Sequence, residues 1–373
     1  MTVTIRPGTL AGDIAAMPSK YDLHRLLIAS HLAGMDLEYL PVISDDIAVT
    51  KECLQNASGN CRESGSTLRF LLPVFAALGK SVTFTGEGRL PERPMQPLID
   101  QLRAHGCTID RDRLPITIAG RLRPGVFTLP GDVSSQYVTG LLFALPLLPG
   151  DSEIALASPL ESRGYVDMTL RTLRKFGIVI NEAEYGFQVP GGQAYQPLAG
   201  PPMPDADWSS AAFWLAAGAL GSNVRVTGLD EASAQPDRVI AGLLNELPGE
   251  VDVSQCPDLA PILAVVMALT PGERRIVNAA RLRLKESDRL HAMALNLNAL
   301  GADAAELPDG LAIRGKPTLC GGAADSFGDH RIAMALAIAA LHCENAVTLH
   351  GAEAVRKSYP EFWEDYQRLG GQI

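Results

Sequence analysis

Arginines occur at the starts of apolar helices, where a structural role alone does not require them. Arg69 and Arg331 fall in the first turns of helices that we expect to begin near Gly65 and Asp329. The N-terminal end of a helix carries partial positive charge, so a cation there is unfavourable unless an anion binds beside it. Backbone N–H groups and a nearby guanidinium together bind phosphate or carboxylate. A surface salt bridge is the simpler interpretation for either arginine alone.

Six other cations have comparable settings. Arg93 lies between two prolines, which fix the backbone and direct its side chain. Lys285 and Arg289 are four residues apart, so we expect them to share one helix face. The complete set consists of Lys20, Arg25, Arg69, Arg93, Lys285, Arg289, Arg331 and Lys357. Any one of these residues could be an ordinary solvated charge, but the whole set indicates a site that binds a small anion.

Neutral and acidic side chains accompany these cations. Ser134, Ser135 and Gln136 place two hydroxyls and an amide at a helix start, either as an N-cap or as part of a phosphate site. Asp258 opens another apolar helix, where the N-cap role alone accounts for it. Glu286 lies beside two cations, which hold its proton affinity in a range useful for acid–base catalysis.

The elements that position these residues belong to a repeated unit. In each complete copy an amphipathic helix ends at Gly and leads into two short apolar strands. The complete copies cover residues 97–120, 170–191 and 290–315. Two further helices, at 45–56 and 236–247, end without a hairpin, so we interpret them as trimmed copies.

The chain closes on itself at its two ends. The last helix, expected at 359–369, lacks a following hairpin, and N-terminal strands at 2–5 and 12–17 could supply it. Six units then divide into two pseudo-symmetric halves, with crossovers at 17–18 and 196–204. We therefore predict an α/β (α+β) fold of two domains with a cleft between them. These domains are residues 18–204, and residues 1–17 plus 205–373.

Composition restricts the class of protein. The chain has 373 residues and 47% hydrophobic residues, which suits a globular protein of two domains. The net charge of −10 disfavours nucleic acid and anionic membranes, since both require a basic surface. No apolar run could span a bilayer, and the first residues do not resemble a signal peptide. We expect a cytoplasmic monomer whose six scattered cysteines are reduced.

Seven motifs, in order, resemble the 5-enolpyruvylshikimate-3-phosphate synthase family between residues 18 and 363. They are Pro-Ser-Lys at 18–20 with Arg25, Glu-Ser-Gly-Ser-Thr-Leu-Arg at 63–69, Pro-Glu-Arg-Pro at 91–94, Ser-Ser-Gln at 134–136, Lys-Glu-Ser-Asp-Arg at 285–289, Asp-His-Arg at 329–331 and Lys-Ser-Tyr-Pro at 357–360. The resemblance implies the enolpyruvyl-transferase fold, an inside-out α/β barrel of βαβαββ units. It also implies transfer of the enolpyruvyl group of phosphoenolpyruvate to the 5-hydroxyl of shikimate 3-phosphate, in chorismate synthesis, without metal or organic cofactor.

The resemblance also assigns site residues. Phosphoenolpyruvate would contact Lys20, Gly65, Arg93, Gln136, Arg289, Arg331 and Lys357. Shikimate 3-phosphate would contact Lys20, Tyr21, Arg25, Ser134, Ser135, Gln136, Ser162, Tyr165, Asp258 and Lys285, which makes residues 18–204 the acceptor-binding half. Asp258 would accept the proton of the acceptor hydroxyl, and Glu286 with Lys20 would protonate the methylene carbon. Arg69 would support the site, and glyphosate would compete with phosphoenolpyruvate near Gly65.

One departure leaves alternatives open. Tyr21 stands where the family usually has Ser, a contact of the shikimate carboxylate. An enolpyruvyl transferase for another anionic acceptor, or a non-catalytic homologue that binds an anionic metabolite, therefore remains possible. The related UDP-N-acetylglucosamine enolpyruvyl transferase normally has a Cys in the loop that here spans 86–93, and this loop has none. RNA 3′-phosphate cyclase is disfavoured by the acidity of the chain and by a missing His motif.

Overall fold

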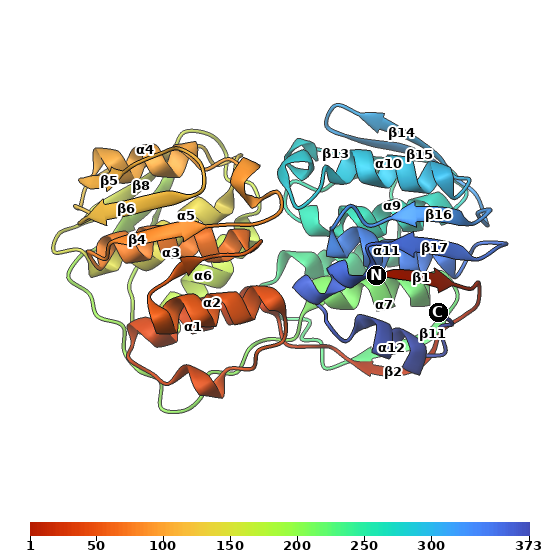
Figure 1. The fold of residues 1–373 in the computed structure, drawn as a ribbon, viewed down its shortest axis with the longest axis horizontal. Coiled ribbons are helices and arrows are strands. Elements are labelled where there is room, and N and C mark those ends of the chain that lie inside the picture. Colours follow the sequence, from red (N-terminus) through yellow and green to blue (C-terminus); the bar gives the residue numbers. More distant parts are fainter. The chain divides into compact units, whose positions relative to one another are not determined.

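A computed structural model describes residues 1–373, which form two compact units (Figure 1). Unit 1 comprises Met1–Ser19 and Asp205–Ile373, and unit 2 comprises Lys20–Pro204. The first boundary, at 19/20, lies two residues from the predicted boundary at 17/18, and the second coincides with the predicted one at 204/205.

Unit 2 contains two four-stranded sheets with equivalent strand orders. The first has the order β3 (Gly59–Asn60), β4 (Val82–Thr85), β6 (Ile116–Gly120), β5 (Cys107–Ile109), and the second has β7 (Val126–Leu129), β8 (Ser152–Leu156), β10 (Gly186–Val189), β9 (Asn181–Ala183). In each sheet the first two strands are parallel, and the remaining two join them as an antiparallel hairpin. A parallel pair needs a crossover connection, here a helix, so each sheet is one complete βαβαββ unit.

The helices of unit 2 supply its core. They are α1 (Lys20–Leu32), α2 (Asp45–Asn56), α3 (Gly65–Ala77), α4 (Gln96–Ala104), α5 (Ser135–Ala144) and α6 (Arg163–Lys175), with 3-10 helices at Leu37–Tyr39, Leu90–Glu92 and Leu145–Leu147. Nearly every residue of α3 and α5 is buried, because these helices are apolar on all sides. No hairpin follows α2, which confirms that this copy of the unit is trimmed.

Unit 1 contains sheets of four, three and two strands. They have the orders β12 (Glu250–Asp252), β13 (Gly272–Val277), β15 (Gly310–Gly315), β14 (Asp303–Leu307); β1 (Thr2–Ile5), β17 (Val347–His350), β16 (Gly322–Asp325); and β11 (Asn223–Thr227), β2 (Ala11–Ala15). The N-terminal β1 pairs antiparallel with β17, so the start of the chain adds a strand to the sheet formed by its last strands. The prediction for the second N-terminal strand was wrong, because β2 pairs in parallel with β11 and so begins another copy of the unit.

The helices of unit 1 are shorter than predicted in two places. They are α7 (Trp208–Ala219), α8 (Ile240–Asn245), α9 (Ala260–Leu269), α10 (Arg289–Ala299), α11 (His330–Ala340) and α12 (Phe362–Arg368), with 3-10 helices at Pro236–Val239 (η4), Pro257–Leu259 (η5), Ala280–Leu284 (η6) and Ala352–Lys357 (η7). The helix predicted at 236–247 is a 3-10 turn followed by the short α8, and α12 begins three residues after Tyr359. Both α9 and α11 are completely buried.

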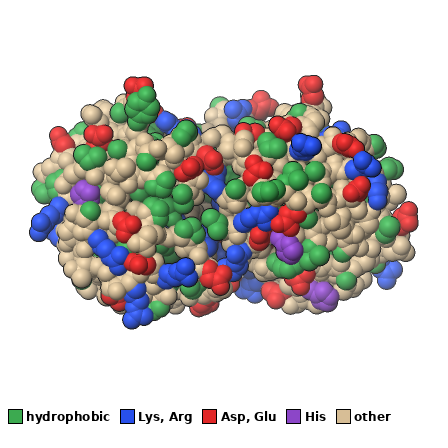
Figure 2. Space-filling model, turned by 90° about the horizontal axis from the view of Figure 1, so that it is seen from above, with side chains coloured by type: hydrophobic (Ala, Val, Ile, Leu, Met, Phe, Trp, Pro, Cys, Tyr) green, Lys and Arg blue, Asp and Glu red, His purple; other side chains and the backbone are tan.

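The surface is charged but mixed in sign. On the face shown in Figure 2, acidic and basic side chains are interspersed over each unit. None of the helices has both the length and the hydropathy that a membrane span requires.

Candidate active site

In unit 1 a single guanidinium joins three carboxylates. Arg289, the first residue of α10, places Nη1 2.7 Å from Asp258 Oδ1, Nη2 3.0 Å from Glu286 Oε2, and Nε 2.8 Å from Asp329 Oδ2. Its side chain is only 2% exposed. Burial alone would lower its pKa, but the three carboxylates, led by Asp329, outweigh burial and raise the pKa above its usual value. The two predicted acid–base residues, Asp258 and Glu286, therefore share one cation.

Asp258 also contacts the second arginine of this unit. Arg331 Nη2 lies 3.4 Å from Asp258 Oδ2, and Arg331 Nη1 donates to Ser209 Oγ at 2.7 Å. The interpretation of Asp258 as an N-cap of α9 is wrong. The residue lies in the 3-10 helix η5, and the residue preceding α9 is Leu259. Its carboxylate contacts the guanidiniums of both Arg289 and Arg331.

Asp329 is the buried carboxylate of the same cluster. Its carboxylate is completely buried and accepts hydrogen bonds from Arg289 Nε at 2.8 Å and from Ser287 Oγ at 3.1 Å. It also caps α11 by accepting from the backbone N–H of Arg331 at 2.9 Å. One carboxylate thus fixes the side chain of the first arginine and the backbone of the second.

The two predicted lysines of unit 1 lie outside the α-helices. Lys285 follows η6 in extended conformation, and α10 begins only at Arg289, so the prediction that these two residues share a helix face was wrong. Desolvation lowers the pKa of Lys285 to about 8, although the carboxylate of Asp258 partly opposes this shift. Lys357 is buried at the end of η7.

In unit 2 the first turn of α1 carries a cation and an aromatic ring. Lys20 Nζ lies 3.0 Å from Asp46 Oδ2 of α2, and both residues are less than 10% exposed. The ring of Tyr21 contacts the ring of Tyr165, with centroids 4.9 Å apart and planes tilted by 40°. The Tyr at position 21 therefore lies against a second predicted acceptor contact. Ser162, also predicted, directly precedes α6 with φ of 54°.

Arg25 holds this aromatic pair in place. Its Nη2 donates to the carbonyl of Tyr165 at 2.6 Å, and its Nη1 donates to the carbonyl of Tyr21 at 2.7 Å. Its Nε donates to Thr169 Oγ1 at 2.9 Å. Desolvation lowers the pKa of Arg25 to about 10, so the group stays charged at neutral pH. Its side chain links α1 and α6 and orients the ring of Tyr165.

The starts of α3 and α5 form a second polar group in unit 2. Arg69 Nη1 donates to Gln136 Oε1 at 3.0 Å, and Gln136 Nε2 donates to Ser66 Oγ at 2.9 Å. Ser134 caps α5 by accepting from the backbone N–H of Gln136 at 3.3 Å, and Ser135 is the first residue of that helix.

Gly65 lets two guanidiniums approach the start of α3. A Cβ atom at this position would lie 2.6 Å from Nη1 of Arg69 and 2.6 Å from Nη1 of Arg93. Two cations beside a helix N-terminus are an arrangement suited to an anion. The structure therefore brings Gly65, Arg69 and Arg93 together at the start of α3.

Six residues outside the predicted set hold the predicted site residues in place. They are Asp46, Ser66, Thr169, Ser209, Ser287 and Asp329. Ser66, Ser287 and Asp329 stand inside the motifs at 63–69, 285–289 and 329–331, and Asp329 was also expected to begin a helix. The others meet the site through tertiary packing alone.

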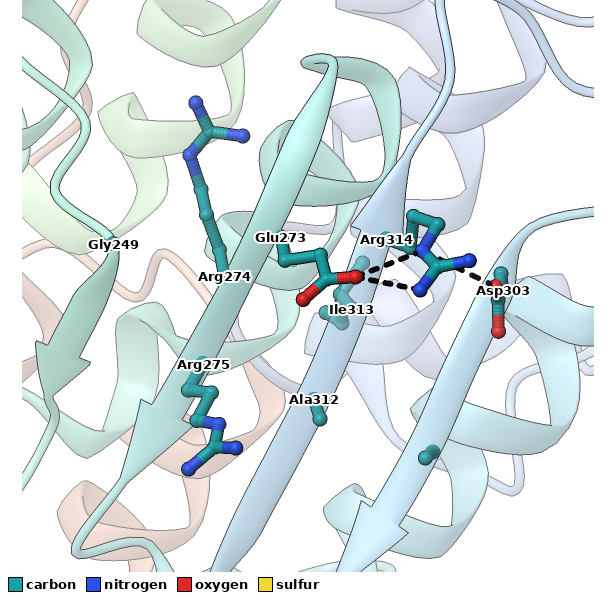
Figure 3. Close-up of a pocket in the computed structure, with 9 residues that line it drawn as sticks. Gly249, Glu273, Arg274, Arg275, Asp303, Ala312, Ile313 and Arg314 are labelled. Atoms are coloured by element: carbon teal, nitrogen blue, oxygen red, sulfur yellow. Dashed lines mark hydrogen bonds and ion pairs between the residues drawn. The ribbon is translucent and has the colours of Figure 1, made fainter.

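A shallow pocket of unit 1 contains none of the predicted residues (Figure 3). It has a volume of about 400 Å³ and lies on the exposed face of the β12-β13-β15-β14 sheet, where Arg274, Arg275 and Arg314 are among its lining residues. Arg314 pairs with Glu273 at 2.5 Å, and both side chains are more than 60% exposed. Water screens such exposed pairs, so this pocket is not a candidate active site.

Solved enolpyruvyl transferases have the same fold. EPSP synthase from Acinetobacter baumannii superposes with a TM-score of 0.80 at 23% identity, covering 99% of this chain and 98% of that one. The enolpyruvyl transferase NikO from Streptomyces tendae superposes with a TM-score of 0.75 at 19% identity, covering 100% and 98%. The chain therefore has the fold of the enolpyruvyl transferases.

Sequence similarity specifies the family within that fold. The model for EPSP synthase (3-phosphoshikimate 1-carboxyvinyltransferase) matches residues 42–251 and 238–366. A 3-phosphoshikimate 1-carboxyvinyltransferase of Clostridium kluyveri is 42% identical over 418 residues, covering 100% of this chain and 98% of the relative. That of Clostridium acetobutylicum is 43% identical over 420 residues, with the same coverage. This chain belongs to the EPSP synthase family.

The length of the alignment shows that this chain is shorter than its relative. An alignment of 418 residues that covers all 373 residues includes 418 − 373 = 45 positions without a residue here. The missing hairpins after α2 and α8 are consistent with this difference.

Proposed function

We propose that this chain transfers the enolpyruvyl group of phosphoenolpyruvate to the 5-hydroxyl of shikimate 3-phosphate and releases phosphate, as a step of chorismate synthesis. The observation that carries the proposal is the cluster around Arg289, where two carboxylates suited to proton transfer, Asp258 and Glu286, flank a buried cation. The names of the Clostridium relatives specify the same reaction.

The cations have a clear task in this reaction. Phosphoenolpyruvate carries a phosphate and a carboxylate, and guanidiniums bind both groups in a bidentate manner. We assign this role to Arg289, Arg331 and Lys357 of unit 1. The residues of unit 2 that we assign to the same substrate are Lys20, Gly65, Arg93 and Gln136.

The acceptor would use a different set of side chains. We assign its phosphate to Ser134, Ser135, Gln136 and Lys285. Its ring would contact Ser162 and Tyr165, with Tyr21 beside them and Arg25 holding the two tyrosines. These residues make unit 2 the principal acceptor-binding unit.

Proton transfer accounts for the two acids. The acceptor oxygen attacks C2 of phosphoenolpyruvate and loses its proton to Asp258, while C3 gains a proton from Glu286 or Lys20. Elimination reverses the second transfer: C3 loses a proton, the double bond re-forms, and the bond from C2 to the phosphate oxygen breaks. Fixed cations around the reacting groups stabilise the charge that develops in both steps.

A different acceptor acid is the second candidate. The phenol of Tyr21 is much larger than a serine hydroxyl and lies against Tyr165, so it reduces the space beside the proposed acceptor ring. The chain would then prefer an acceptor acid that is narrower than shikimate 3-phosphate or that carries its polar groups in other positions.

Phosphate release tests both candidates. The purified chain is incubated with phosphoenolpyruvate and shikimate 3-phosphate, and free phosphate is measured by a coupled assay. Turnover that falls at least about 100-fold in Glu286→Gln and in Asp258→Asn supports the proposed roles. Release only with another hydroxy acid supports the second candidate, and tight binding without release with any acid refutes catalysis.

A further inference from the structure

A chain of buried hydrogen bonds connects three helices of unit 2. His24 Nδ1 of α1 lies 2.9 Å from Thr50 Oγ1 of α2, which lies 2.6 Å from Thr67 Oγ1 of α3. Thr67 Oγ1 in turn lies 2.7 Å from Oγ of Ser64, the N-cap of α3. We call these four residues the hydroxyl relay. None of them belongs to the predicted substrate contacts.

The relay is shielded from water along its whole length. His24 and Ser64 are each 1% exposed, and Thr50 and Thr67 are completely buried. Hydrogen bonds in such surroundings are stronger than in water, and loss of a partner leaves a polar atom without compensation. The relay therefore fixes the spacing of the helices that it joins.

The imidazole of His24 has a defined role at one end. Burial lowers its pKa to about 3, so the ring is neutral and carries one N–H group. Nε2 is buried without a hydrogen-bond partner. A proton on Nδ1 donates to Thr50, whereas a proton on Nε2 would be a buried donor without an acceptor. The ring therefore donates through Nδ1 at the start of the relay.

The relay lies one helical turn from a proposed substrate contact. The ion pair of Lys20 with Asp46 also joins α1 to α2, four residues before His24 and Thr50 respectively. Two parallel connections, one ionic and one neutral, thus hold these helices together. The neutral connection continues to Ser64, directly before the start of α3.

We propose that His24 is a positioning residue that sets, through Thr50 and Thr67, the place of Lys20 and of the α3 N-terminus in the phosphoenolpyruvate site. The inference rests on the proposed function. His24 itself touches no substrate and transfers no proton. The four relay residues make no hydrogen bond of their own to α5 or α6, which carry Gln136 and Tyr165 among the proposed acceptor contacts.

Conservative substitutions separate positioning from simple packing. Thr50→Val removes only the central hydroxyl, and His24→Leu removes the terminal donor. His24→Asn retains a side-chain N–H near the place of Nδ1 and serves as the rescue variant. Thr172→Val is the matched control, since it removes a buried hydroxyl of the same unit that donates only to the carbonyl of Met168.

The expected result is a selective change in substrate affinity. Thr50→Val and His24→Leu should raise the KM for phosphoenolpyruvate about tenfold and the KM for the acceptor less than about threefold. His24→Asn and Thr172→Val should stay within about twofold of wild type for both substrates. If Thr50→Val and His24→Leu lose thermal stability but keep the wild-type KM for phosphoenolpyruvate, the relay is purely structural and the proposal is refuted.

Absence of turnover in the wild-type chain would by itself refute the proposed function. A second measurement tests the positioning role of His24 even in that case. An amine reagent is added, and its reaction at Lys20 is compared by peptide mass spectrometry with that at the exposed Lys175. Reaction at Lys20 should be several-fold faster in Thr50→Val and His24→Leu than in wild type, His24→Asn and Thr172→Val. Equal rates in all five proteins would overturn the positioning role.

Discussion

The pH dependence of acceptor use should report the titration of Lys285. Desolvation lowers the pKa of this ammonium group to about 8, whereas an exposed lysine titrates near 10.4. The protonated form would bind the acceptor phosphate, and the neutral form would not. Raising the pH through 8 should therefore weaken acceptor binding, long before ordinary lysines lose their protons.

The size of the effect follows from the pKa. With a pKa of about 8, roughly nine tenths of Lys285 is protonated at pH 7 and roughly one tenth at pH 9. The kcat/KM for the acceptor reports groups of the enzyme form that the acceptor binds, so it should fall about tenfold across this interval. A phosphate monoester with a second pKa near 6 is already a dianion over this range and adds no change of its own.

Steady-state phosphate release at saturating phosphoenolpyruvate, measured from about pH 7 to pH 9.5, provides the assay. Lys285→Arg is the matched variant, because a guanidinium stays charged at every pH of the series. Its profile should be flat in the interval where that of wild type declines, whatever its absolute rate. A decline that persists unchanged in Lys285→Arg, or a wild-type profile that is flat to pH 9, would refute the assignment.

Three further substitutions probe the site. Gly65→Ala should raise the KM for phosphoenolpyruvate at least about tenfold by displacing the guanidinium of Arg93, and an unchanged KM in a steady-state assay would contradict this contact. Asp329→Asn keeps an N-cap but removes a buried negative charge beside Arg289, which retains two other carboxylates. Urea denaturation should show that the free energy of unfolding falls by about 2 kcal/mol, and a fall of less than about 0.5 kcal/mol would be inconsistent with this pairing. Tyr21→Ser should change the acceptor KM and leave that for phosphoenolpyruvate unaltered, so equal changes in both would exclude a specific role of the phenol.

The repeated pattern of helix, strand and hairpin was visible in the sequence because it depends on local signals. Gly at helix ends and alternating apolar residues predicted the hairpins that complete each four-stranded sheet. The pairing of β2 with β11 was not predictable in this way, since the partners lie more than 200 residues apart and share no local signal. Only the packed unit selects between the two sheets that β2 could extend.

Among the site residues, too, only those with a local sequence signal could be predicted. Motifs identified most cations, but their carboxylate partners Asp46 and Asp329 come from other helices and meet them only after folding. One error was avoidable: Asp288 caps α10 by accepting from the N–H of His291 at 3.1 Å, and an Asp before an apolar helix is a usual N-cap. That signal would have placed Lys285 outside the helix.

The pairing of β1 with β17 has a consequence for synthesis of the protein. Thr2 lies opposite His350, so β1 must wait for the synthesis of more than 340 further residues before it finds its partner. Unit 2 is a single uninterrupted segment, Lys20–Pro204, and can fold while translation continues. A ribosome stalled before residue 347 should therefore carry a folded unit 2, resistant to protease, beside an N-terminal strand that remains open to cleavage.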